Sequence, residues 1–163
     1  MRKISLFSLC FLLILGGCSF ISQNNDLNGF CQRMNTFYSE KLFSPDGYVI
    51  DTENNTYYRF FQFKENEVLL KFRYDEEYIL NEMNIIFEKD AFNDKNVYRF
   101  TENCLKSFIT NEENYKNILK EIDLKKTLCE NTLKSKEAET GNIKMSVDVT
   151  DIGSVITVYL LSE

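Results

Sequence analysis

The 163-residue sequence contains no histidine and no tryptophan, and it has one proline and six glycines. Without histidine, the Ser-His-Asp and Cys-His catalytic mechanisms are excluded, together with the common zinc sites that use histidine ligands. None of the five cysteines forms a C-x-x-C pair, which argues against a thiolate zinc site or a thioredoxin-like redox motif. A Walker loop, a dinucleotide fingerprint and an EF-hand loop are absent as well. What remains open is carboxylate chemistry and non-enzymatic binding.

The first twenty residues are the most distinctive stretch of the chain. Arg2 and Lys3 precede an apolar run, Ile4–Ile14, and Leu-Gly-Gly-Cys follows at 15–18. The run is too short to span a hydrocarbon core, which takes about 20 residues, and its flanks are typical of a cleaved signal. These residues resemble a bacterial lipoprotein signal peptide with its lipobox. The resemblance implies that Cys18 is diacylated and becomes the mature N-terminus, and two acyl chains suffice for stable anchoring.

This resemblance divides the chain into a signal peptide (1–17), a lipidated tether (18–26) and one domain (27–163). It implies a protein of the cell envelope that is held by its lipid and faces the periplasm. Ser19 stands where Gram-negative lipoproteins retained in the inner membrane carry aspartate, so we expect the outer membrane in a cell with two membranes. An ordinary secretory signal with a chance cysteine, or an uncleaved anchor, is the alternative interpretation.

The predicted mature chain is strongly acidic. Loss of residues 1–17 removes two of the 19 basic side chains and none of the 25 acidic ones, so the net charge changes from −6 to −8. Such a surface repels nucleic acid and anionic lipid headgroups and favours a basic protein partner. The simpler alternative is that the charge serves solubility.

Three cysteines remain in the predicted mature chain, because Cys10 is lost with the signal peptide and Cys18 carries the lipid. In an oxidising compartment, Cys31, Cys104 and Cys129 predict one disulfide and one thiol. If two straight helices meet near Asn111, Cys104 and Cys129 lie ~10 Å and ~27 Å from that hinge, whereas a disulfide needs Cα atoms within about 7 Å. That pair therefore requires a break in the second helix, for example at Asp123, and Cys31 with either of the others fits better.

Apolar residues at helical spacing follow the N-cap residue Asp26 and predict a helix over Leu27–Phe43. Period-two and aromatic-rich segments follow, so we expect five strands between residues 48 and 100. The predicted strands are Tyr48–Asp51, Tyr57–Phe63, Val68–Asp75, Ile79–Glu88, for which a helix is the alternative, and Val97–Phe100.

Two helices are predicted next, one capped by Thr101 and a longer one capped by Asn111 that ends before Thr140. Two strands, Ile143–Thr150 and Val155–Leu161, complete the chain, and the last is apolar on both faces, which predicts a central position. The sequence therefore predicts an α+β fold. Its sheet is mostly antiparallel, with about five to seven strands, and an N-terminal helix and a later helix pair pack on it.

Five aromatic residues fall within residues 57–63. On a strand, alternate residues point to opposite faces, so Tyr58 and Phe60 share one face while Tyr57, Phe61 and Phe63 share the other. One set enters the core, and the other meets a helix, a partner or water. The sequence does not decide between them. Tyr58 and Phe60 are the interface candidates, because aromatic residues are enriched where proteins bind each other.

Carboxylates are the only candidate catalytic groups: Asp75-Glu76-Glu77, Glu112-Glu113, and Asp46 with Asp51. Their contexts favour a charged turn, a helix N-terminus and loops, so no catalytic residue, metal or cofactor is predicted. We expect a lipid-anchored, protein-binding domain, with an inhibitor or immunity protein against a toxin or lytic enzyme as its natural version. The alternatives are an envelope assembly or structural accessory lipoprotein, a glycan hydrolase of the cell wall, and a carrier of a small apolar ligand.

Overall fold

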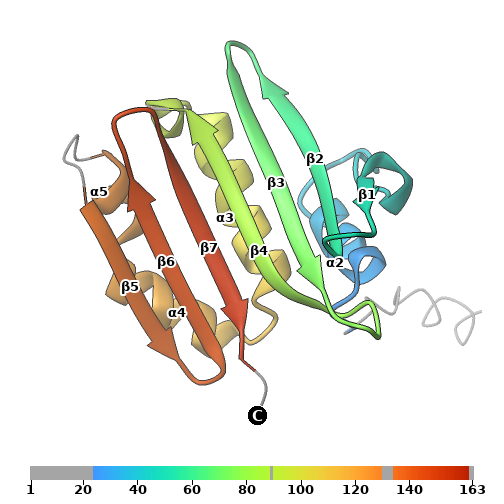
Figure 1. Cartoon of the computed structure of the whole chain (residues 1–163). Coiled ribbons are helices and arrows are strands. Elements are labelled where there is room, and N and C mark those ends of the chain that lie inside the picture. The colour runs from blue at the N-terminus through green and yellow to red at the C-terminus, as the bar shows by residue number, and fades with distance from the viewer. Residues whose placement is uncertain (1–23, 89, 130–133, 162–163) are drawn as a thin grey trace, which may run out of the picture.

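Seven strands form one antiparallel sheet in the computed structural model, which describes residues 24–88, 90–129 and 134–161 (Figure 1). Their order across the sheet is β1-β2-β3-β4-β7-β6-β5. Two meanders, β1 to β4 and β5 to β7, therefore meet where β4 pairs with β7. The strands are β1 (Val49–Asp51), β2 (Thr56–Phe63), β3 (Asn66–Tyr74), β4 (Leu80–Glu88), β5 (Lys134–Thr140), β6 (Ile143–Val149) and β7 (Gly153–Leu160).

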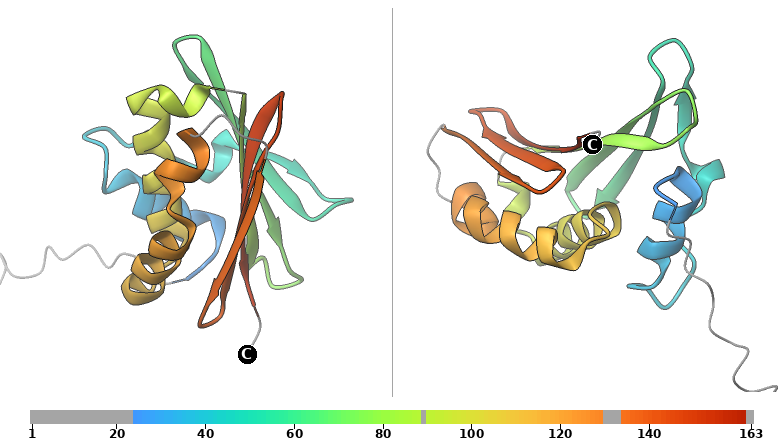
Figure 2. Two further views of the ribbon diagram at one scale, coloured as in Figure 1. Left: turned by 90° about the vertical axis from the view of Figure 1, so that its left-hand side faces the viewer. Right: turned by 90° about the horizontal axis from the view of Figure 1, so that it is seen from below.

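The described helices all lie on one face of this sheet and leave the other face open (Figure 2). The predicted α+β class, with its mostly antiparallel sheet, early helix and later helix pair, is confirmed. The segment 79–88 is the predicted strand rather than a helix. The helices are α2 (Leu27–Asn35), η1 (Pro45–Gly47), η2 (Ala91–Asn93), α3 (Lys95–Phe108), α4 (Glu112–Ile122) and α5 (Leu124–Cys129).

The first helix is shorter than predicted. Asp26 does cap it by accepting the Gly29 N–H at 2.6 Å, but α2 ends at Asn35 instead of Phe43. The Asn35 amide accepts the Phe43 N–H at 2.9 Å and donates to the Phe43 carbonyl at 2.7 Å. These two bonds hold the loop folded back, and the buried Phe43 ring then packs 5.6 Å from the ring of Phe61. Tertiary burial of one phenylalanine has replaced two further helical turns.

The predicted strand Val97–Phe100 and the predicted cap at Thr101 are wrong. Both belong to α3, whose cap is Asp94, accepting the Asn96 N–H at 2.8 Å. Four apolar side chains recur at helical spacing through the whole helix and are all buried, which makes a strand at its start unfavourable. Those side chains are Val97, Phe100, Cys104 and Phe108.

The later helix also ends sooner than predicted. Asn111 caps α4 as expected, but Asp123 adopts a left-handed conformation (φ 46°) that stops it, and α5 follows. Strand β5 occupies 134–140, whereas the predicted helix ran on to just before Thr140. Gly141 (φ 58°) serves the two-residue turn from β5 to β6 rather than a helix C-terminus. Pairing with β6 has overridden the helix propensity of this Lys- and Glu-rich segment.

The core lies between the sheet and the helices. Phe30 of α2, Phe72 of β3 and Phe108 of α3 are fully buried, with the Phe30 and Phe72 rings 4.7 Å apart. Burial of each such side chain contributes about 1.5–3 kcal/mol. The last strand, β7, lies inside the sheet as predicted, between β4 and β6. The helices cover only one of its faces, however, so the apolar character of both faces does not mean that both are covered (Figure 2).

Candidate protein interface on the open face

The two aromatic sets of β2 face opposite sides of the sheet. Phe61 and Phe63 point to the helices, where their rings lie 4.7 and 5.1 Å from the ring of Phe100. Tyr58 and Phe60, the predicted interface candidates, lie on the open face, and Phe60 is 54% exposed to solvent. The structure thus separates a set that packs the core from a set that does not.

Strand register extends Phe60 into a continuous apolar row on the open face. Phe60 pairs with Leu69 of β3, Leu69 with Ile86 of β4, and Ile86 with Val155 of β7. Neighbouring strands lie about 4.8 Å apart, so the row spans roughly 15 Å across four strands. Ile152, 82% exposed in the turn before β7, extends the apolar surface. Phe60, Leu69, Ile86, Val155 and Ile152 are called the apolar row below.

A shallow groove of about 420 Å³ lies along the apolar row. The exposed acidic residues Glu67 and Glu88 line it beside the apolar side chains. Asp148 of β6 pairs with Val155 and so continues the row as a charged residue, accepting the Ser135 hydroxyl at 2.5 Å. The groove therefore combines an apolar floor with an acidic border.

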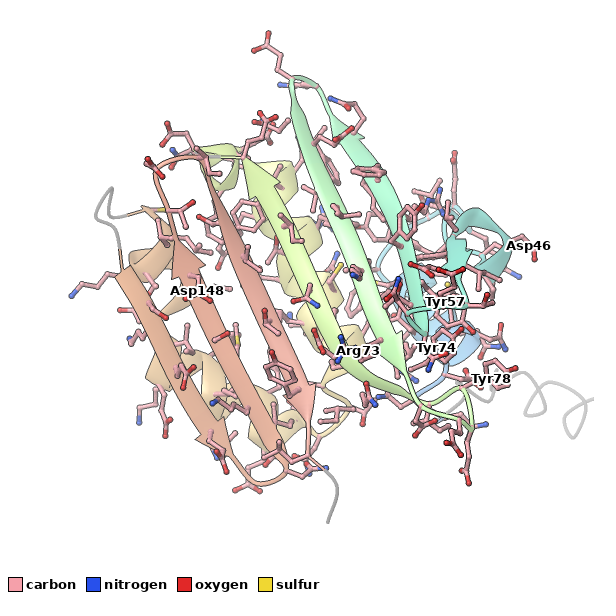
Figure 3. The ribbon with its side chains drawn as sticks, in the orientation of Figure 1. Asp46, Tyr57, Arg73, Tyr74, Tyr78 and Asp148 are labelled. Atoms are coloured by element: carbon pink, nitrogen blue, oxygen red, sulfur yellow. The ribbon has the colours of Figure 1, made fainter. Side chains whose placement is uncertain are left out.

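Part of the open face outside the row is polar, and its side chains bond to one another. Thr157 donates to the Asn84 side chain at 2.8 Å, and that amide donates to Glu82 at 2.7 Å. Glu82 also lies 3.7 Å from the Arg73 guanidinium, which Figure 3 labels on this face together with Asp148. Such paired groups gain little from a partner, whereas exposed apolar side chains gain from being removed from water. The apolar row is the part of this face best suited to bind.

Tyr58 and Phe60 were predictable from the sequence as interface candidates, whereas the other members of the row were not. Leu69 lies on the same face of β3 as the polar residues Lys71 and Arg73. An apolar residue at a solvent-facing position was the available signal. Ile86 and Val155 join it only through the pairing of β4 with β7, which brings together residues 69 positions apart in the chain.

The candidate catalytic carboxylates make contacts that are common in turns and at helix N-termini. Asp75 accepts the Glu77 and Ile79 N–H groups, each at 2.9 Å, in the turn after β3. Hydrogen bonds from Asn54 hold the pKa of Asp51 below its usual value, and an ion pair with Lys116 does the same for Glu112. A general acid needs a raised pKa instead. These two groups are therefore poorly suited to protonate a glycosidic oxygen.

Glu113 lies in the first turn of α4, and Asp46 lies in η1. In the described part of the chain, no three or more histidine, cysteine, aspartate or glutamate side chains gather into a group that could hold a metal ion.

The three cysteines expected to supply a disulfide are all free thiols, so the predicted bridge is not formed among the described residues. Cys31 and Cys104 are buried in α2 and α3, whereas Cys129 is exposed at the end of α5. Burial raises the pKa of Cys31 to about 12 and raises that of Cys104 as well, so neither thiol acts as a nucleophile near neutral pH. The chain does break its helix at Asp123, as pairing of Cys104 with Cys129 would require, but both of these thiols are free.

Cys18 and the rest of the leader lie outside the described residues, and lipidation stays a prediction. No helix within the described ranges has the length and apolar character needed to cross a membrane. The chain was also compared with protein-family models, with curated proteins and with solved structures, and none of them matches it.

Proposed function

We propose that this chain is a lipid-anchored, periplasm-facing protein that binds a basic protein partner on the open face of its sheet. The observation that carries the proposal is the apolar row: five residues from four strands and one turn, exposed or half-buried, beside Glu67 and Glu88. An apolar centre with a charged rim is the usual build of a protein interface. The acidic border and the negative net charge favour a basic partner.

An inhibitor or immunity protein fits this description best. Blocking a toxin or a lytic enzyme requires a rigid surface held where that enzyme acts, and a lipid anchor would supply the location. A surface on sheet strands is held by backbone hydrogen bonds and by the core beneath it, so little ordering is needed upon binding. The alternative, an accessory lipoprotein of an envelope assembly, would use the same face for a different partner.

Site-specific photo-crosslinking in the native envelope tests the proposal. A photoreactive amino acid at position 86, within the apolar row, should capture one basic protein in a fixed ratio. The same amino acid at position 139, on the distant edge strand β5, is the control and should capture nothing specific. Identity of the captured protein separates a toxin or lytic enzyme from an envelope component.

Leu69→Lys combined with Val155→Lys should abolish the product crosslinked from position 86, because it places positive charges in the apolar row against a basic partner. Glu139→Gln should leave that product unchanged. Equal capture from positions 86 and 139, or capture by the double variant at the normal level, would contradict binding at the apolar row.

Anchoring is tested separately. Cys18→Ser should remove the acyl modification and release the chain from membranes, as judged by fractionation and mass spectrometry. A lipid-modified Cys18→Ser chain would contradict the lipobox assignment and leave the crosslinking result untouched.

A further inference from the structure

A second concave site lies away from the apolar row, at the corner where α2, η1, β1 and the turn between β3 and β4 meet. It is a pocket of about 480 Å³ whose lining includes Tyr48, Tyr57, Tyr78, Asp26 and Asp46. Figure 3 shows Tyr57, Tyr74 and Tyr78 following one another through this corner, with Asp46 towards its outer side. The pocket lined by Tyr48, Tyr57, Tyr78, Asp26 and Asp46 is called the tyrosine pocket below.

The rings of Tyr57 and Tyr78 line the pocket, and each contacts the ring of Tyr74 behind them. The centroids of Tyr57 and Tyr74 lie 4.5 Å apart, and those of Tyr74 and Tyr78 lie 5.5 Å apart with their planes 22° from parallel. Tyr74 is buried, whereas Tyr78 is 62% exposed. The buried ring fixes the positions of its neighbours, so the exposed wall exists before any ligand binds.

Tyr78 has an unusual backbone that supports this arrangement. Its φ is 62°, in the left-handed region that aromatic residues seldom adopt and that costs about 1–2 kcal/mol. Hydrogen bonds within the turn hold it there: Tyr78 N–H donates to the Asp75 carbonyl at 3.0 Å, and Ile79 N–H donates to the Asp75 carboxylate at 2.9 Å. A glycine at this position would avoid the cost but would lack the ring.

The charge of the lining selects the ligand. Asp26 and Asp46 contribute carboxylates, and the lining includes no lysine or arginine. The Asp26 carboxylate accepts the Gly29 N–H and interacts with the charge of the nearby Arg33 guanidinium, so the exposed Asp46 is the carboxylate more available to a ligand. An anion is disfavoured here. A metal ion would have two carboxylates at most, fewer oxygen ligands than calcium or magnesium prefers.

Tyrosine faces beside carboxylates are the recognised environment for an organic cation, which is attracted by the quadrupole of the ring. The same corner already contains one such contact, because the Arg59 guanidinium lies 5.8 Å from the centroid of the Tyr48 ring. We propose that the tyrosine pocket binds an alkylammonium group, with the Tyr57 and Tyr78 rings against its methyl or methylene groups and Asp46 against its charge. Free amines and the headgroups of amine-bearing phospholipids share this chemistry.

The test titrates the full chain, in a maltoside detergent, with choline and follows the backbone amides of Asp46 and Tyr78 by NMR. Choline should shift both amides, and sodium at equal ionic strength should not. Tyr78→Gly should weaken binding about fivefold or more, while Tyr78→Phe, which keeps a ring, should stay within about twofold. Asp46→Asn should weaken binding about threefold. Tyr159→Ala, at an exposed tyrosine on the open face, should have no effect.

Vesicles of phosphatidylcholine distinguish the two sources of the group. The Cys18→Ser chain, which has no lipid of its own, should float with these vesicles if headgroups are the ligand, and Tyr78→Gly should prevent it. Choline binding without vesicle binding would assign the pocket to free amines. No shift with choline, or equal shifts in the wild-type and Tyr78→Gly chains, would overturn the proposal. Neither result depends on the protein partner of the open face.

Discussion

The two faces of one sheet use aromatic residues in opposite ways. On the covered face, Phe61 and Phe63 of β2 pack on Phe100, and Phe72 of β3 is completely buried. On the open face, Phe60 of the same strand is 54% exposed and belongs to a row that no described helix covers. Residue type therefore does not distinguish a core position from an interface candidate in this chain. The layer that lies over each face does.

The largest expected difference between the two faces is in the loss of unfolding free energy caused by Phe72→Ala and by Phe60→Ala. Phe72→Ala removes a ring that lies 4.7 Å from Phe30 and 6.1 Å from Phe108, and it should cost about 3–5 kcal/mol of unfolding free energy. Phe60→Ala should cost less than about 1 kcal/mol, because much of that ring is already in water. Urea unfolding followed by circular dichroism measures both. Similar losses for the two variants would contradict the distinction.

Alkaline pH should destabilise the fold because it ionises two thiols that are buried on the covered side of the sheet. Burial raises the pKa of Cys31 from 9.0 to about 12 and also raises the pKa of Cys104, so the unfolded chain ionises these thiols first. Their contribution to stability is complete below pH 9 and is lost as pH rises from 9 towards 12. The unfolding free energy should fall over this window, and Cys31→Ala should reduce the slope. A slope unchanged by Cys31→Ala would argue against this burial.

Tyr48→Phe should stabilise the covered side slightly. The Tyr48 hydroxyl is buried and has no hydrogen-bond partner among the described residues, and burial raises its pKa. Removing an unpaired buried hydroxyl while keeping the ring should increase the unfolding free energy by about 1 kcal/mol. Thermal unfolding at neutral pH measures the change. A loss of stability instead would reveal a polar partner for this hydroxyl.

Ile152→Ser should have the smallest effect on stability. Ile152 is 82% exposed, so the substitution should change the unfolding free energy by less than about 0.5 kcal/mol. It should nevertheless weaken crosslinking from position 86, since it removes apolar surface from the row. Thermal unfolding and crosslinking on the same preparation check the two statements. A large drop in stability would place this residue in the structural core rather than in an interface.

Several elements were predictable because their signals are local. Asp26 and Asn111 cap helices through their own side chains, and the alternation in 68–74 and 143–149 needs no knowledge of distant residues. The interface candidates Tyr58 and Phe60 were likewise identified from spacing within one strand. Each of these features depends on residues that are neighbours in the chain.

Two of the errors arose where distant contacts overrode a local preference. Asn35 ends α2 because its amide binds Phe43, and the segment 134–140 is a strand because β6 lies beside it. The spacing within 97–108 favours one continuous helix, yet the β-branched and aromatic residues at its start suggested a strand.

The sequence by itself determined the acidic charge, the absence of histidine chemistry, the two-sided pattern of β2 and the resemblance of residues 1–18 to a lipoprotein leader. The tertiary structure alone decided which side of β2 is covered, since that depends on where α2 and α3 pack. It also decided that Phe60, Leu69, Ile86 and Val155 form one row, because register between strands brings them together. Covalent order fixes which residues alternate, but only packing determines which of them meet water.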